Sequence, residues 1–222
     1  MVSAMPEDGG SRPRRRPTAG LTDRRYSARV ARVGDASRPS PRHLTDAVAR
    51  GATIRDVATS GLDVLFCGIN PGRWSGAVGH HFAHPGNRFW KALYLSGFTD
   101  RQLDPAEERL MLHYGLGITN LVARTTAGAA ELDTAELRAG AVALERKVRR
   151  LGPKVVAFLG MGAFRVAFGR PRAGAGRQPD RLAAAVVWVL PNPSGLQAAY
   201  GLDQVVDRMR ELRAFISQPP GA

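Results

Sequence analysis

Four short strand-like segments, separated by helical patterns, constrain the fold of this chain most strongly. They span residues 62–67, 117–122, 154–159 and 185–190, and three of them are almost continuously apolar: LDVLFC, KVVAFL and AVVWVL. Short apolar runs bounded by turn residues are typical of strands buried on both faces. Strands that alternate with helices favour a parallel sheet covered on both sides. The sequence therefore predicts an α/β fold: a single three-layer domain with a central, mostly parallel sheet flanked by helices.

Helix signals lie between and around these strands. Ser40 followed by Pro41 predicts the start of a helix that runs to about Arg50. Further helices are expected over residues 88–97, 104–115, 133–150, 162–168 and 202–215. The polar segments up to Gly86 and over 170–180 are expected to be loops. The folded domain should span residues 41–217, between an N-terminal arm (1–40) and a short tail (218–222).

The formal net charge of +13 indicates a polyanionic partner such as nucleic acid, although a GC-rich genome that favours arginine codons would also produce it. Residues 1–50 hold 11 basic and 5 acidic side chains. Residues 1–40 mix Pro, Gly, Ser and Arg without periodicity, so we expect them to be disordered. Their basic cluster resembles a DNA-tethering arm, with an inert tail as the alternative. The cluster consists of Arg12, Arg14, Arg15 and Arg16.

Several classes of protein are disfavoured by what the sequence lacks. It contains no run of about twenty apolar residues and no apolar signal core near Met1, so we expect neither a membrane span nor export. Its one cysteine, Cys67, excludes an intrachain disulfide, a zinc finger and a four-cysteine iron–sulfur cluster. No glycine-rich phosphate loop follows any strand, which disfavours a nucleotide-binding protein. A cytoplasmic location is expected.

Functional sites of parallel α/β sheets lie at the carboxyl ends of the strands, where the sequence places three polar turns: 68–72, 119–120 and 191–195. In the first, glycines permit close backbone approach and Pro71 stiffens the turn. Asn70 therefore projects a neutral amide that can hold a water or bind a carbonyl group of a ligand. A plain strand-end turn is the alternative interpretation.

The last of these turns is followed directly by Leu196. An exposed leucine beside a polar loop can wedge into a base stack and fill the gap that a flipped nucleotide leaves. A leucine packed against its own loop is the alternative.

The loop over 79–87 contains three histidines within five residues, but no companion ligands with metal-binding spacing stand nearby. We therefore expect neither a metal nor a cofactor. Phe82 in the same loop can stack on a base or pack into the core.

These motifs together resemble the mismatch-specific uracil-DNA glycosylases of bacteria and the thymine-DNA glycosylases of animals. GINPG (68–72), HPGNRFWK (84–91), GITNLVARTT (117–126) and LPNPSGL (190–196) carry the resemblance, which spans about residues 52–216. It implies that Asn70 positions the hydrolytic water and that Phe82 stacks on the flipped base. The remaining implied pocket residues are Gly68, Ile69, Pro71, Gly72, Ser75 and Asn120. The residues implied to contact DNA are Asn192, Pro193, Ser194, Gly195, Leu196, as the wedge, and Gln197.

The resemblance implies a monofunctional, monomeric glycosylase of base excision repair that acts at the bacterial nucleoid. It would flip uracil out of mismatched duplex DNA and excise it by hydrolysis, with thymine as a further candidate base. A glycosylase for hypoxanthine, xanthine or ethenocytosine, and a lesion-binding module without catalysis, are the alternatives. Related glycosylases with an aspartate at the position of Asn70 have a general base that this chain lacks. Ala198 stands where a relative has arginine, and position 120 varies between lysine and asparagine among relatives.

Overall fold

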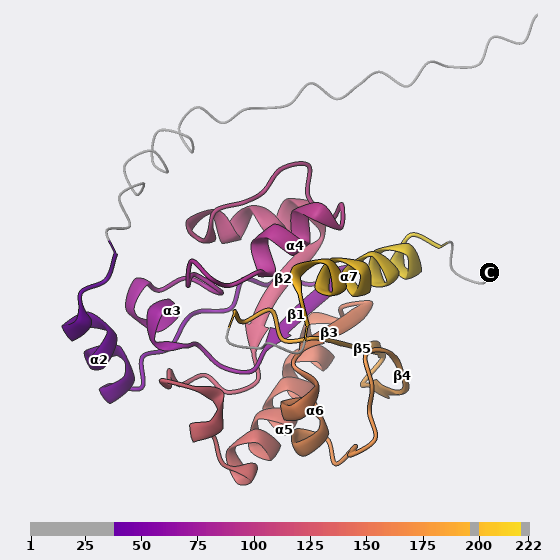
Figure 1. Ribbon diagram of the computed structural model, residues 1–222. Helices are drawn as coiled ribbons and strands as arrows, with labels where there is room; N and C mark the ends of the chain where they lie inside the picture. Colours follow the sequence, from indigo (N-terminus) through magenta and orange to yellow (C-terminus); the bar gives the residue numbers. More distant parts are fainter. Residues whose placement is uncertain (1–37, 196–199, 219–222) are drawn as a thin grey trace, which may run out of the picture.

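The apolar segments form a five-stranded sheet within residues 38–195 and 200–218, the part of the chain that the computed structural model describes (Figure 1). The strand order is β2-β1-β3-β5-β4. Three pairings, β1 with β2, β1 with β3 and β3 with β5, are parallel, and β4 pairs with β5 antiparallel. The strands are β1 (Val64–Gly68), β2 (Leu116–Asn120), β3 (Val155–Leu159), β4 (Gly176–Leu182) and β5 (Ala185–Leu190). The predicted mostly parallel sheet is confirmed.

Helices cover both faces of this sheet. The α-helices are α2 (Pro41–Ala49), α3 (Arg73–Val78), α4 (Phe89–Leu95), α5 (Thr134–Leu151), α6 (Met161–Ala167) and α7 (Leu202–Ile216), and the 3₁₀ helices are η1 (Pro105–Tyr114) and η2 (Ala129–Glu131). On one face Phe66 and Ile118 join a core with α4, η1 and α7. On the other face Leu65 and Phe158 pack with α5 and α6, which gives the three predicted layers (Figure 1).

Local capping explains where several helices begin. The Ser40 side chain accepts a hydrogen bond from the backbone N–H of His43 at 3.3 Å. Asp104 opens η1, and Asp133 opens α5; each forms a reciprocal capping box with the glutamate three residues later. These side chains satisfy N–H groups that have no partner within their own helix. The predicted starts near 41, 104 and 133 are thereby confirmed.

Three elements were not predicted: the single-turn 3₁₀ helix η2, the strand β4 and the helix α3. Residues 170–180 were expected to be a loop, but β4 runs through Gly176–Leu182 (GRQPDRL) at the edge of the sheet. It is largely exposed and its register shifts between Arg177 and Arg181, around Pro179. An edge strand needs no apolar run and tolerates proline, so the hydrophobic pattern missed it.

The third missed element is α3 (RWSGAV), within the segment expected to be a loop. It contains Gly76, a poor helix former, where an added Cβ would lie 2.2 Å from Oγ1 of Thr125. The glycine therefore lets α3 pack closely against the strand-end segment 121–126. Tertiary packing, rather than helix propensity, accounts for this helix.

Most of the predicted N-terminal arm, residues 1–37, lies outside the described residues, as do 219–222 of the tail. Of the last residues assigned to the arm, Pro39 is buried and Ser40 caps α2. Within the described residues, no helix has the length and apolar character needed to cross a membrane.

Candidate active site

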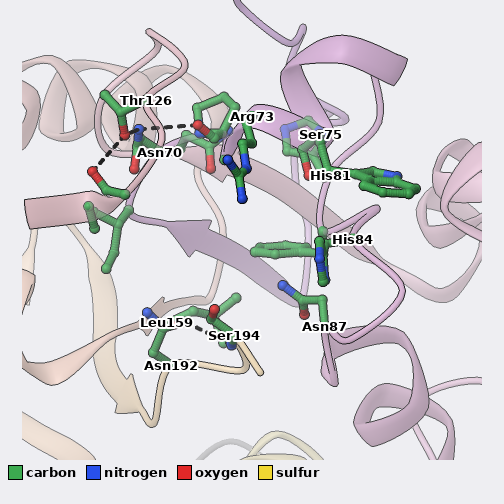
Figure 2. Close-up of a pocket in the computed structure, with 18 of the residues that line it drawn as sticks. Asn70, Arg73, Ser75, His81, His84, Asn87, Thr126, Leu159, Asn192 and Ser194 are labelled. Atoms are coloured by element: carbon green, nitrogen blue, oxygen red, sulfur yellow. Dashed lines mark hydrogen bonds between the residues drawn. The ribbon is translucent and has the colours of Figure 1, made fainter. Parts of the chain in front are cut away.

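A cavity of about 400 Å³ opens at the carboxyl ends of the parallel strands (Figure 2). Most of its lining comes from four segments far apart in the sequence: 69–75 after β1, 81–87 before α4, 120–129 from the end of β2 onward, and 192–195 after β5. Ile54 and Leu159 complete the lining. The three polar turns chosen from the sequence therefore contribute to one site, as the strand-end argument requires. Of the predicted pocket residues, those that line the cavity are Ile69, Asn70, Pro71, Gly72, Ser75, Phe82 and Asn120.

Asn70 has a side-chain amide held in one orientation. Its Nδ2 atom donates to Thr126 Oγ1 at 2.7 Å and to the carbonyl oxygen of Pro71 at 3.2 Å (Figure 2). It also donates to the carbonyl oxygen of Arg124 at 3.1 Å. Carbonyl oxygens only accept hydrogen bonds, so the nitrogen must face them and Oδ1 must point the other way. No described residue donates to Oδ1. The arrangement leaves an acceptor beside the cavity that can orient a water molecule.

Residues 121–126 form the scaffold that holds the GINPG turn. The backbone N–H groups of Leu121 and Val122 donate to the carbonyl oxygens of Gly68 and Ile69, each at 2.9 Å. The Thr126 hydroxyl in turn donates to the carbonyl oxygen of Gly128 at 2.9 Å. No role was predicted for Thr126, although it belongs to the GITNLVARTT motif.

Gly68 lies beneath the cavity rather than in its wall. An added Cβ there would lie 2.6 Å from Oδ1 of Asn120 and 3.2 Å from Cζ of Phe82. A side chain at this position would push both residues out of place. Glycine is thus required for close packing under the pocket.

Phe82 packs against the core, as one of its two interpretations expected, and it also lines the cavity. Its stacking on a base stays a prediction. Its ring lies 4.3 Å from that of Phe89, centroid to centroid. Its backbone is left-handed (φ 53°), a conformation that costs about 1–3 kcal/mol for a residue other than glycine. Next to it, buried Ser75 accepts a hydrogen bond from the Ala83 N–H at 3.0 Å. The surrounding contacts therefore hold Phe82 in a strained position at the cavity wall.

Two of the loop histidines anchor this segment to η1 through a buried carboxylate. Glu108 accepts hydrogen bonds from the backbone N–H and Nδ1 of His81, at 2.8 and 2.9 Å, and lies 3.2 Å from Nδ1 of His80. Burial alone would raise the Glu108 pKa, but the bonds from His80 and His81 outweigh it and lower that pKa to about 2. The hydrogen bond to Glu108 correspondingly raises the pKa of His80. These contacts give both histidines a structural role.

Within the described ranges, no three His, Cys, Asp or Glu side chains are grouped as metal ligands. The expectation that the protein needs no metal and no cofactor stays a prediction.

The rim of the cavity carries charge and aromatic groups that the sequence did not single out. Arg73 extends towards the cavity near Asn70 and Ser75 (Figure 2). The rings of Trp74 and His84 meet edge to face, 5.4 Å apart. No Asp or Glu and no other Arg or Lys of the described chain lines the cavity. An arginine and a tryptophan after a turn give no local signal of a site, because only the fold brings them to the rim.

The segment after β5 closes the opposite wall. Asn192, Ser194 and Gly195 line the cavity, and Asn192 Oδ1 accepts from the Ser194 N–H at 2.9 Å. Pro193 is buried and does not line it. Leu196 and Gln197, predicted to contact DNA, lie outside the described residues.

Comparison with known proteins agrees with this geometry. Residues 55–214 match the family model of the uracil DNA glycosylase superfamily. The chain belongs to that superfamily. The superfamily implies a DNA-binding glycosylase that hydrolyses the N-glycosidic bond of uracil-type damage.

A solved structure shares the fold. It is the solution NMR structure of a Methanosarcina acetivorans protein described as a candidate uracil DNA glycosylase, with a TM-score of 0.52 and 16% sequence identity. The match covers 73% of this chain and 98% of that one. At this identity the likeness concerns the fold alone.

Proposed function

We propose that this member of the superfamily is a mismatch-directed, monofunctional glycosylase that flips uracil, and more slowly thymine, out of duplex DNA and excises it with water. The fixed amide of Asn70 carries the proposal, because its free Oδ1 can accept a hydrogen bond from a water beside the cavity. An amide orients water without removing its proton. The water would add to the sugar as the bond to the base breaks, and the proton it loses would pass to solvent or to the departing base anion.

The remaining chemistry concerns the leaving base. Cleavage builds negative charge on the base and positive charge on the sugar, and fixed dipoles aimed at that charge lower the barrier. The described lining contains no carboxylate that would repel this anion. Its polar groups are amides, hydroxyls, the imidazoles of His81 and His84, and the guanidinium of Arg73. Phe82 offers a ring face for stacking, and Ser75 and Asn120 offer polar groups for the base edge.

Preference for mismatches follows from the same features. A site without a carboxylate as general base depends on substrates that leave or unpair easily, and a mismatched base costs less to extrude than a paired one. The expected enzyme is therefore slow and selective. We expect it to act as a monomer.

The proposal is tested with labelled oligonucleotides that hold one G·U, A·U or G·T pair, or uracil in a single strand, followed by alkaline cleavage. We expect the rate to fall from G·U to A·U, with G·T slower than G·U. Equal rates on G·U and A·U would contradict mismatch selectivity. Faster cleavage of hypoxanthine, xanthine or ethenocytosine than of G·U would show a glycosylase for another lesion, and binding without cleavage would show a lesion-binding module.

A further inference from the structure

We propose that His84 binds the flipped nucleotide, and that its Nε2–H donates to an oxygen atom that carries negative charge. Two oxygens of this nucleotide fit that description: a carbonyl oxygen of the leaving base, which gains charge as the bond breaks, and an oxygen of the adjoining phosphate. The inference rests on the proposed function and deepens it, because it names a donor that was not predicted from the sequence.

His84 is the histidine of the loop over 79–87 that pairs with no carboxylate of the described chain. The Nδ1 atoms of His80 and His81 lie 3.2 and 2.9 Å from the carboxylate oxygens of Glu108, which accounts for these two rings structurally. His84 has no such anchor, and it lines the cavity (Figure 2). Its imidazole is therefore available to a ligand in the cavity.

The turn that follows His84 determines where the proton of its ring lies. Residues 84–87 (HPGN) form a turn in which the Asn87 N–H donates to the His84 carbonyl oxygen at 2.7 Å. The Gly86 N–H donates to Nδ1 of His84 at 3.0 Å. A ring nitrogen that accepts a hydrogen bond carries no proton, so the proton lies on Nε2. No residue of the described ranges accepts a hydrogen bond from Nε2, which leaves this donor for a ligand.

Two contacts hold the His84 ring in place before any substrate binds. A Cβ added to Gly86 would lie 3.2 Å from Nδ1 and 3.3 Å from Cε1 of His84, so the ring packs closely over a backbone without a side chain. The ring also meets the Trp74 indole edge to face, with the centroids 5.4 Å apart. A donor that is already fixed needs no reorganisation when negative charge develops beside it. His84 is thus preorganised as a donor.

The turn itself is anchored to the cavity wall that follows β5. The Arg88 N–H donates to the carbonyl oxygen of Pro193 at 2.9 Å. A Cβ added to Gly195 would lie 2.5 Å from the carbonyl oxygen of Gly86, so the two loops pack backbone to backbone. These contacts fix the turn, and with it the donor, relative to the wall formed by residues 192–195.

The surroundings of this donor suit an anionic oxygen. The described lining holds no Asp or Glu that would compete for the N–H group. A fixed donor that meets a developing anion contributes about 100-fold or more to the rate. A phosphate is charged before and after cleavage, so a donor to it stabilises the bound state throughout and contributes to affinity instead.

The test compares His84→Asn with His84→Ala. An asparagine side chain can accept the Gly86 N–H and is favoured at the first position of a turn, so it keeps the turn but removes the Nε2 donor. Alanine removes both. We expect both variants to lose about 100-fold in single-turnover excision from a G·U duplex, or about tenfold in affinity for it. Wild-type rate and affinity in His84→Asn would overturn the proposal and leave His84 as a turn residue.

His113→Ala is the matched control. His113 is exposed on η1 and does not line the cavity, so this variant removes an imidazole without touching the site. It should match the wild type in rate and in affinity. An equal loss in this variant would show that the effect is not specific to His84, and would overturn the proposal.

Replacement of uracil by 5-fluorouracil tells the two oxygens apart. Fluorine stabilises the departing anion, so the loss of a donor to the base costs less with this substrate. A smaller rate loss on 5-fluorouracil than on uracil would identify the base carbonyl as the acceptor. Weaker binding with an unchanged rate at saturating enzyme would identify the phosphate.

Imidazole nitrogen-15 signals of the full-length wild type give a readout that needs neither a variant nor cleavage. We expect the Nε2 signal of His84 to shift when the protein binds a duplex that holds a cleavage-resistant 2′-fluoro-deoxyuridine opposite guanine. An unmoved signal in the bound protein would overturn the proposal. If the wild type cleaves no uracil, the proposed function fails, while this signal still decides whether His84 binds the nucleotide.

Discussion

Nδ2 of Asn70 lies 2.7 Å from Oγ1 of Thr126, and this hydrogen bond joins two turns that are 56 residues apart in the sequence. The Thr126 hydroxyl accepts a hydrogen bond from this amide and donates one to the carbonyl oxygen of Gly128. Its oxygen is therefore the acceptor towards Asn70, and its proton is used elsewhere. Through this bond the segment after β2 determines which atom of Asn70 faces the cavity.

Thr126→Val should therefore slow excision by about tenfold while DNA binding changes little. The valine keeps the shape of the side chain but removes one of three acceptors of the amide, so Asn70 can rotate away from the orientation that holds water. Single-turnover rates at saturating enzyme check this. Thr125→Val is the matched control, since the Thr125 hydroxyl bonds to the Ala52 carbonyl oxygen instead. A rate equal to the wild type would show that Asn70 keeps its orientation without Thr126.

Glu108→Gln should destabilise the protein in a way that depends on pH. The Glu108 pKa is depressed to about 2. The contribution of this carboxylate to the free energy of unfolding is therefore complete above the usual carboxyl pKa of about 4.3, and it is lost as the pH falls towards 2. The His80 pKa is raised. The stabilisation by protonated His80 is therefore complete below the usual histidine pKa, and it is lost as the pH rises through the raised pKa. The stability difference between wild type and variant should therefore be largest near pH 5.

Denaturant unfolding of both proteins from pH 2.5 to 9 measures this difference. We expect about 1–3 kcal/mol at pH 5, the cost of leaving a buried donor without its partner. A difference that does not change with pH would contradict the assigned ionisation of Glu108.

Arg73→Ala should weaken binding to uracil-containing duplex and lower the slope of log K against log salt by about one. Arg73 is the one Arg or Lys that lines the described cavity wall, and its charge suits a phosphate or a developing anion. Equilibrium binding at several salt concentrations gives the slope. An unchanged slope would show that Arg73 meets no DNA phosphate.

Removal of residues 1–37 should weaken nonspecific DNA binding and reduce its salt dependence, with little change in the excision rate at saturation. This deletion removes eight arginines. It stops before Ser40, because a longer deletion would remove the cap of α2. If affinity and salt slope both stay at the wild-type values, the arm is an inert tail whose arginines reflect codon usage.

The fold was predictable from the sequence where hydrophobic pattern and capping dominate. Segments 62–67, 154–159 and 185–190 became β1, β3 and β5 within two residues, because strands buried on both faces must be apolar. The exposed strand β4 and the short helix α3 depend on neighbours elsewhere in the chain. Local patterns carry no information about such neighbours.

The candidate site was predictable to a similar extent. Asn70, Phe82 and Asn192 follow strands or lie in recognised motifs, and they meet at the cavity. Thr126 contributes to the site by binding Asn70, a residue 56 positions away in the sequence. Its role exists only once the fold brings these two segments together.

The central claim is that Asn70 supports catalysis and contributes little to DNA binding. The most direct measurement is the single-turnover excision rate of Asn70→Ala on a G·U duplex, beside its equilibrium affinity for the same duplex. We expect the rate to fall by at least about 100-fold, since a displaced water costs on that scale. The affinity should stay within a few-fold, because phosphate contacts supply most of it. An excision rate near that of the wild type, at undiminished affinity, would contradict the account.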